Sequence, residues 1–146
     1  MTAVGDAEAP VTFDTKIAVV IRDDLATWQK LNVTAFMTSG VVGQGAGLIG
    51  EAYRDASGNL YLPLLIQPVL VFQASGEQLT AVLERARGRE VPVAIYTEEM
   101  FATGHDAANR AAVRAVPYEA LALVGLALRG GRKHMDKILK GLRLHP

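Results

Sequence analysis

Three polar segments of the sequence carry groups that could take part in acid–base chemistry or hold a ligand. The carboxylates of Asp24, Glu98 and Glu99 could activate a water molecule, as a hydrolytic enzyme requires. The side chains that could bind a ligand through charge or hydrogen bonds are Arg22, Asp23, Ser75, Thr97 and His105. Residues of these types also cap helices and form ion pairs, so each has a structural interpretation beside the functional one.

Other common chemical motifs are missing or stand in the wrong context. Residues 45–50, Gly-Ala-Gly-Leu-Ile-Gly, match the letters of the dinucleotide-binding fingerprint. That fingerprint directly follows a first strand, whereas a whole helix is expected between Ile21 and Gly43, and residues 72–74 end the next strand without an acidic side chain. The sequence contains no Gly-x-Ser-x-Gly, His-x-His or His-Glu-x-x-His motif. We therefore expect no cofactor and no metal ion.

The composition is that of a single domain with a substantial core. The chain has 146 residues, is 50% hydrophobic and 21% charged, and carries no formal net charge. It lacks cysteine, which excludes thiol catalysis, cysteine-ligated zinc and disulfide bonds. No apolar run approaches the roughly 18 residues of a membrane span. We expect a cytoplasmic protein that does not contact a membrane.

The charges are unevenly distributed along the chain. Residues 1–128 contain nine basic and fourteen acidic side chains, whereas residues 129–146 contain six basic side chains and one acidic. The basic segment could contact an anion, but it has no aromatic residue to stack on a base, and the acidic body would repel nucleic acid. We expect no nucleic-acid binding beyond the weak non-specific range.

Apolar strands and amphipathic helices alternate along the chain. Strands are expected at residues 16–22, 69–72, 91–96 and 121–128, with a helix after each. Residues 51–54 and 60–62 predict a peripheral hairpin around the five-residue loop 55–59. The prediction is a three-layer α/β/α domain over residues 13–146, with a mixed, mainly parallel four-stranded sheet, after a mobile tail at residues 1–12.

The first helix carries a stripe at helical spacing that consists of Leu25, Trp28, Leu31 or Asn32, Ala35 and Phe36. We expect this stripe to pack on the sheet. If Trp28 is fully buried, truncating it to alanine should cost about 3–5 kcal/mol of stability.

The strand directions bring the candidate residues together. If the first three strands are parallel, then Arg22, Ser75 and Thr97 lie at one edge of the sheet, with His105 in the loop beyond. Ligands of α/β proteins bind at such an edge. We therefore expect a cleft for an unidentified small molecule at the carboxyl ends of the strands.

Two stretches resemble an uncharacterised bacterial family of small domains that is related in structure to the type II peptidyl-tRNA hydrolases. They are residues 17–32, with Ile-Ala-Val-Val-Ile-Arg-Asp-Asp-Leu at the start, and residues 124–144, with Asp-Lys-Ile-Leu-Lys-Gly-Leu-Arg-Leu at the end. Residues 98–110 are also similar in sequence to this family, so the resemblance covers residues 13–146. The resemblance implies the hydrolase fold and a tendency to form homodimers.

The hydrolases themselves are matched only in part. Arg22, Asp24 and Leu25 match their Arg-x-Asp-Leu pattern, but their Gly-Lys-rich segment and their Asp-Ala-Gly-x-Thr loop are absent. Lys30 is an offset counterpart of their functional lysine, and it joins Asp24, Glu98 and Glu99 as a candidate catalytic residue. We expect an unidentified activity at the cleft, with a peptidyl-tRNA hydrolase-like enzyme and a non-catalytic homodimeric interaction module as the alternatives.

Overall fold

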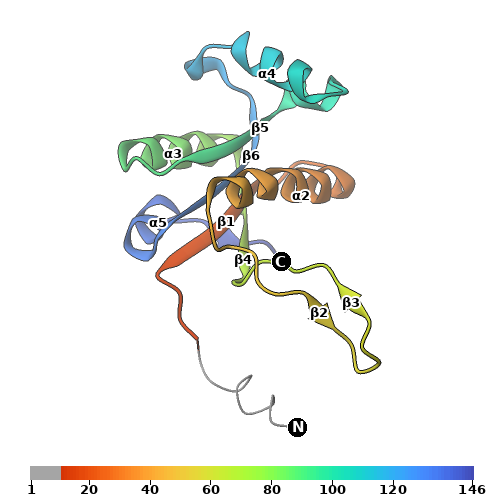
Figure 1. Ribbon diagram of the computed structural model, residues 1–146. Helices are drawn as coiled ribbons and strands as arrows, with labels where there is room; N and C mark the ends of the chain where they lie inside the picture. The colour runs from red at the N-terminus through yellow and green to blue at the C-terminus, as the bar shows by residue number, and fades with distance from the viewer. Residues whose placement is uncertain (1–10) are drawn as a thin grey trace.

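A computed structural model describes residues 11–146 of the chain. The mobile tail predicted for residues 1–12 therefore falls almost entirely outside the described residues. The centre of the fold is a five-stranded sheet in the order β5-β6-β1-β4-β7 (Figure 1). Its strands are β1 (Thr15–Arg22), β4 (Val69–Ala74), β5 (Val93–Thr97), β6 (Leu123–Gly131) and β7 (Arg143–Leu144).

The sheet is mixed, as predicted, but it is mostly antiparallel and has a fifth strand. Only β1 and β4 are parallel neighbours, whereas β6 is antiparallel to both β1 and β5, and β7 is antiparallel to β4. The prediction of a mainly parallel, four-stranded sheet was wrong. The reason lies between β5 and β6, where η1 (Glu98–Ala102), α4 (Asp106–Arg114) and η2 (Tyr118–Ala120) do not cross back over the sheet. Helix α4 packs on η1 and buries no residue, so the chain re-enters the sheet at the end where it left.

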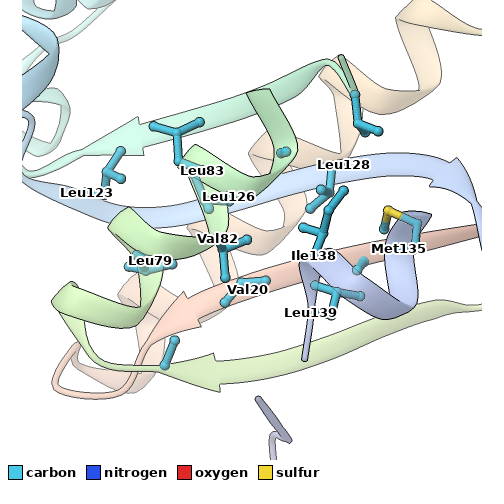
Figure 2. Close-up of a cluster of buried hydrophobic side chains, with 14 residues drawn as sticks. Val20, Leu79, Val82, Leu83, Leu123, Leu126, Leu128, Met135, Ile138 and Leu139 are labelled. Atoms are coloured by element: carbon cyan, nitrogen blue, oxygen red, sulfur yellow. The ribbon is translucent and has the colours of Figure 1, made fainter. Parts of the chain in front are cut away.

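Helices cover both faces of the sheet and complete the three layers. Helix α2 (Thr27–Gln44) lies on one face, while α3 (Gly76–Gly88) and α5 (Arg132–Ile138) lie on the other. Each face of the sheet has its own hydrophobic core. Figure 2 shows the core on the α3 and α5 face, where Val20 and the leucines of β6 meet apolar side chains of both helices. The alternation of side chains along β1 divides it between the two cores, with Ala18 and Val20 on the α3 face and Val19 and Ile21 on the α2 face.

Helix α2 buries a different stripe from the one predicted. Its buried residues are Val33, Met37 and Val41, whereas Trp28 is 63% exposed. The prediction that Trp28 packs against the sheet was therefore wrong. The helix is apolar on two sides, and the buried side is the one that fits a close approach to β6, where a Cβ atom on Gly125 would lie 2.7 Å from Met37 Cε.

The peripheral hairpin is present as predicted. Strands β2 (Tyr53–Arg54) and β3 (Leu60–Tyr61) pair antiparallel around the loop 55–59 and form a separate two-stranded sheet. Figure 1 shows this hairpin projecting away from the layered body.

Candidate functional site

The carboxyl ends of three strands meet at one edge of the sheet, as the candidate residues require. Because β6 is antiparallel to both of its neighbours, β5 runs in the same direction as β1, and β4 is parallel to β1. Arg22 ends β1, Ser75 follows β4, and Thr97 ends β5. The shared edge was predicted correctly although most neighbouring strands are antiparallel.

Arg22 is the centre of an ion-pair cluster at this edge. Its Nε donates to Asp24 Oδ1 at 2.7 Å, its Nη2 donates to Glu98 Oε1 at 2.8 Å, and its Nη1 donates to the carbonyl oxygen of Leu123 at 3.3 Å. Burial lowers the pKa of the Arg22 guanidinium, but the hydrogen bonds and charges of Asp24 and Glu98 outweigh this effect and raise the pKa overall. The ion pair with Glu98 therefore joins β1 to η1 across the edge, whereas the ion pair with Asp24 stays within the turn that follows β1.

Two of the other candidates cap helices. Ser75 is the N-cap of α3: its hydroxyl accepts from the backbone N–H of Gln78 at 3.1 Å, and its own N–H donates to Gln78 Oε1 at 2.9 Å. His105 is the N-cap of α4, where Nδ1 accepts from the backbone N–H of Ala108 at 3.2 Å. Asp23 and Glu99 are exposed, and each is the sequence neighbour of a residue in the Arg22 cluster.

Thr97 lies inside the protein at the end of β5. Its side chain is 1% exposed, and its Oγ1 is buried without a hydrogen-bond partner among the described residues. A hydroxyl closed off from water in this way cannot contact a ligand that arrives from solution. Among the candidate residues at this edge, the structure therefore joins only Arg22, Asp24 and Glu98 to one another.

Lys30 occupies a different place, in a cavity between α2 and the C-terminal segment. The cavity has a volume of about 510 Å³, within the range of roughly 300–1,000 Å³ that is usual for small-molecule sites. Its apolar walls come from α2, β1, β4 and the end of the chain: Ile21, Leu31, Ala35, Val71 and Pro146. Its polar groups are Thr27, Lys30, Thr34 and His145.

The ammonium group of Lys30 is held by His145. Lys30 Nζ lies 3.1 Å from His145 Nε2, and His145 Nδ1 lies 3.1 Å from the backbone oxygen of Pro146. These contacts fit a ring that donates from Nδ1 and accepts at Nε2. The backbone N–H of His145 donates to the carbonyl oxygen of Val71 at 2.8 Å, which fixes the ring beside β4. One of the three N–H donors of Lys30 is thus used, and two are left for a ligand.

The sequence analysis named Lys30 through the resemblance to the hydrolases, but it named none of the other residues that line this cavity. His145 is separated from Lys30 by 115 positions. It reaches the cavity because the two-residue strand β7 pairs with β4. Such a short pairing leaves no periodic signal in the sequence, and Thr27 and Thr34 have the spacing of ordinary helix surface residues.

Residues 11–146 contain neither a cluster of potential metal ligands nor a membrane-spanning helix. No three His, Asp or Glu side chains gather there as a group of metal ligands. None of the helices in that part of the chain combines the length and apolar character that a bilayer crossing demands.

A family model described as "Protein of unknown function (DUF2000)" matches residues 15–146. The chain belongs to the DUF2000 family. This confirms the predicted membership in an uncharacterised domain family. No curated protein matches the chain significantly.

A solved structure supports both the family and the fold. This DUF2000 chain is similar to a protein of unknown function, Atu0240, from Agrobacterium tumefaciens strain C58, with 53% sequence identity and a TM-score of 0.90. The match covers 92% of the present chain and 100% of the other.

Proposed function

We propose that the protein binds a small amphipathic carboxylate in the cavity between α2 and the C-terminal segment. The observation that carries this proposal is the Lys30 ammonium group, held by His145 above an apolar floor of Ile21 and Val71. A carboxylate would accept hydrogen bonds from the two free N–H groups of Lys30, while a short hydrocarbon chain would lie along Leu31 and Ala35.

The Arg22 cluster is a weaker candidate for the same function. Its guanidinium already donates to two carboxylates and a backbone carbonyl. An incoming anion would have to displace Asp24 or Glu98, whereas at Lys30 it displaces no protein group.

The finer fold assignment and the compartment belong to the same proposal. The pattern of Arg22, Asp24 and Leu25 at the end of β1 and the parallel pairing of β1 with β4 support a relationship to the type II peptidyl-tRNA hydrolase fold. Peptidyl-tRNA hydrolysis is left out of the proposal, because both motifs of that activity are missing from the sequence. The lack of cysteine fits a reducing compartment, and we place the binding in the cytoplasm.

Sodium octanoate and 1-octanol test the role of Lys30, because the two molecules share a chain length and differ in charge. By isothermal titration calorimetry we expect octanoate to bind about ten- to a hundredfold more tightly than octanol, since a hydrogen bond to a charged group contributes about 1.5–3 kcal/mol. The variant Lys30→Met keeps the apolar stem and should abolish the difference.

Lys137→Met is the matched control, because Lys137 is an exposed lysine on α5, outside this cavity. It should bind octanoate as the wild type does. Equal binding of octanoate and octanol by the wild type, or an unchanged preference in Lys30→Met, would contradict the proposal.

A further inference from the structure

The exposed apolar side chains of the protein are concentrated on two surfaces. Of the twelve large apolar side chains that are exposed in residues 11–146, ten lie on them. Seven belong to residues 48–66, which we call the arm: Ile49, Tyr53, Leu60, Tyr61, Leu62, Leu64 and Ile66. The other three lie on one side of α2 with Ala35, and we call this set the α2 stripe: Trp28, Leu31, Ala35 and Phe36.

The arm is an ordered projection and not a loose loop. Its stem is joined by hydrogen bonds from Gly50 N to Leu64 O at 2.9 Å and from Ile66 N to Leu48 O at 3.0 Å. At its tip, the Asp55 carboxylate accepts from the Tyr61 hydroxyl at 2.7 Å and from three N–H groups of residues 57 and 59. Figure 1 shows the tip held away from the sheet and its helices.

Contacts with a partner would stabilise such an arm further. Its two strands have two residues each, and an isolated two-stranded hairpin is marginally stable at best in water. Leu60 and Leu62 are 62% and 84% exposed. Covering these side chains would remove the cost of exposing them to water.

The exposed apolar area is large enough for a stable interface. Ten large side chains, most of them about half exposed or more, present on the order of 1,000 Å², since one aromatic side chain alone offers 150–250 Å². A standard protein interface buries about 800 Å² on each partner.

We propose that a second copy of this chain covers these surfaces, with the arm of each copy docked on the α2 stripe of the other. A two-fold axis would form both contacts at once, because each copy offers one arm and one stripe. The charges permit this pairing: the arm carries only Glu51, Arg54 and Asp55, and the stripe carries none. The lack of a basic cluster on the arm disfavours nucleic acid and anionic lipid as its occupant.

Sedimentation velocity of the full chain measures the mass of the assembly. At micromolar concentration we expect a particle of twice the 15.6 kDa chain mass. Leu60→Asp and Leu62→Asp each place a charge in the interface, and each should raise the dissociation constant of the dimer more than tenfold. Val11→Asp is the matched control, since Val11 is 69% exposed and outside both surfaces. Circular dichroism would verify that each variant is folded, and Leu62 is so exposed that its variant should fold even if Leu60→Asp does not.

Disulfide cross-linking tests which surfaces meet, because the natural chain has no cysteine. Mixing Leu62→Cys protein with Leu31→Cys protein under mild oxidation should give a mixed dimer faster than mixing Leu62→Cys with Val11→Cys. Trp28 is the only tryptophan, and its emission should shift to the blue as the concentration rises.

A wild-type chain that stays monomeric would overturn the proposal and would leave the arm to a partner other than a second copy. A dimer that is unaffected by both arm variants would overturn it as well. The same holds for cross-linking to Leu31→Cys that is no faster than cross-linking to Val11→Cys.

Discussion

Arg22 and Lys30 are both cationic, but they differ in how much hydrogen-bonding capacity remains for a ligand. All three nitrogens of the Arg22 guanidinium already donate to protein oxygens, two of them on carboxylates. Lys30 contacts one acceptor, the Nε2 atom of His145, and two of its N–H groups remain available to a ligand. The difference makes Arg22 a structural link between strands and Lys30 the better binding group.

Some side-chain contacts of the candidate residues could be predicted from the sequence, and others could not. The cap formed by Ser75 and Gln78 was predictable, because a capping box is a local pattern in which both partners lie within four residues. The contact between Lys30 and His145 was not predictable, because it depends on which strand the last residues join. Arg22, Asp24 and Glu98 were placed at one edge correctly, but their mutual pairing depends on side-chain geometry.

Asp55 allows a prediction on pH at this scale. The hydrogen bonds from Tyr61 and Asn59 hold the pKa of the Asp55 carboxyl at about 2, below its ordinary value of 3.8. Because the folded pKa is the lower one, the stabilisation is fully present above about 3.8 and is lost as the pH falls through about 2. We expect Tyr61→Phe to raise the pKa of Asp55 towards 3.8, since the Tyr61 hydroxyl is the largest cause of the shift.

Carbon-detected NMR titration of the Asp55 carboxyl measures this pKa directly. Tyr53→Phe is the control, because Tyr53 lies opposite Tyr61 in the hairpin and the hydroxyl bound to Asp55 belongs to Tyr61. A pKa of Asp55 that is the same in Tyr61→Phe and in the wild type would show that the tip is not held by this hydrogen bond.

At the scale of the elements, periodicity located the main strands and helices but not the packing of α2. A helix that is apolar on two sides could turn either side towards the sheet, and the periodicity does not distinguish them. In the structure, the side with Val33 and Met37 is buried, and it packs on Gly125. The strand directions had a similar ambiguity. An alternation of strands and helices predicts parallel pairs only if each helix crosses over the sheet, and α4 does not.

The close approach at Gly125 predicts the effect of adding a single methyl group. A Cβ atom there would lie 2.7 Å from Met37 Cε and 2.8 Å from Val33 Cγ1, so α2 would have to move. We expect Gly125→Ala to lower the free energy of unfolding by about 1–3 kcal/mol, as overpacking does. Urea unfolding monitored by circular dichroism measures the change.

Gly43 provides the matched control for this substitution. It lies in α2, and an added Cβ atom would meet nothing within 4 Å. Gly43→Ala should leave the stability unchanged or raise it by up to about 1 kcal/mol, because alanine favours the helix. If both variants had the same stability, the packing of α2 on β6 would be looser than the structure indicates.

At the scale of the whole molecule, the proposed cavity and the proposed interface share a wall. Leu31 and Ala35 line the cavity, and both also belong to the α2 stripe. An arm docked on the stripe would therefore border the cavity and shield a bound hydrocarbon chain from water. Ligand binding and dimer formation should then favour each other.

This coupling gives a prediction that requires both proposals to hold. Octanoate should bind about fivefold or more tightly to the dimer than to the monomeric variant Leu62→Asp, within the range of factors that coupled sites usually show. Because coupling between two binding equilibria is reciprocal, saturating octanoate should lower the dissociation constant of the wild-type dimer by the same factor. Calorimetry on the two proteins and sedimentation with and without octanoate measure the two factors independently. Equal octanoate affinity in dimer and monomer would mean that the arm docks without reaching the cavity, even if the cavity binds octanoate and the chain forms dimers.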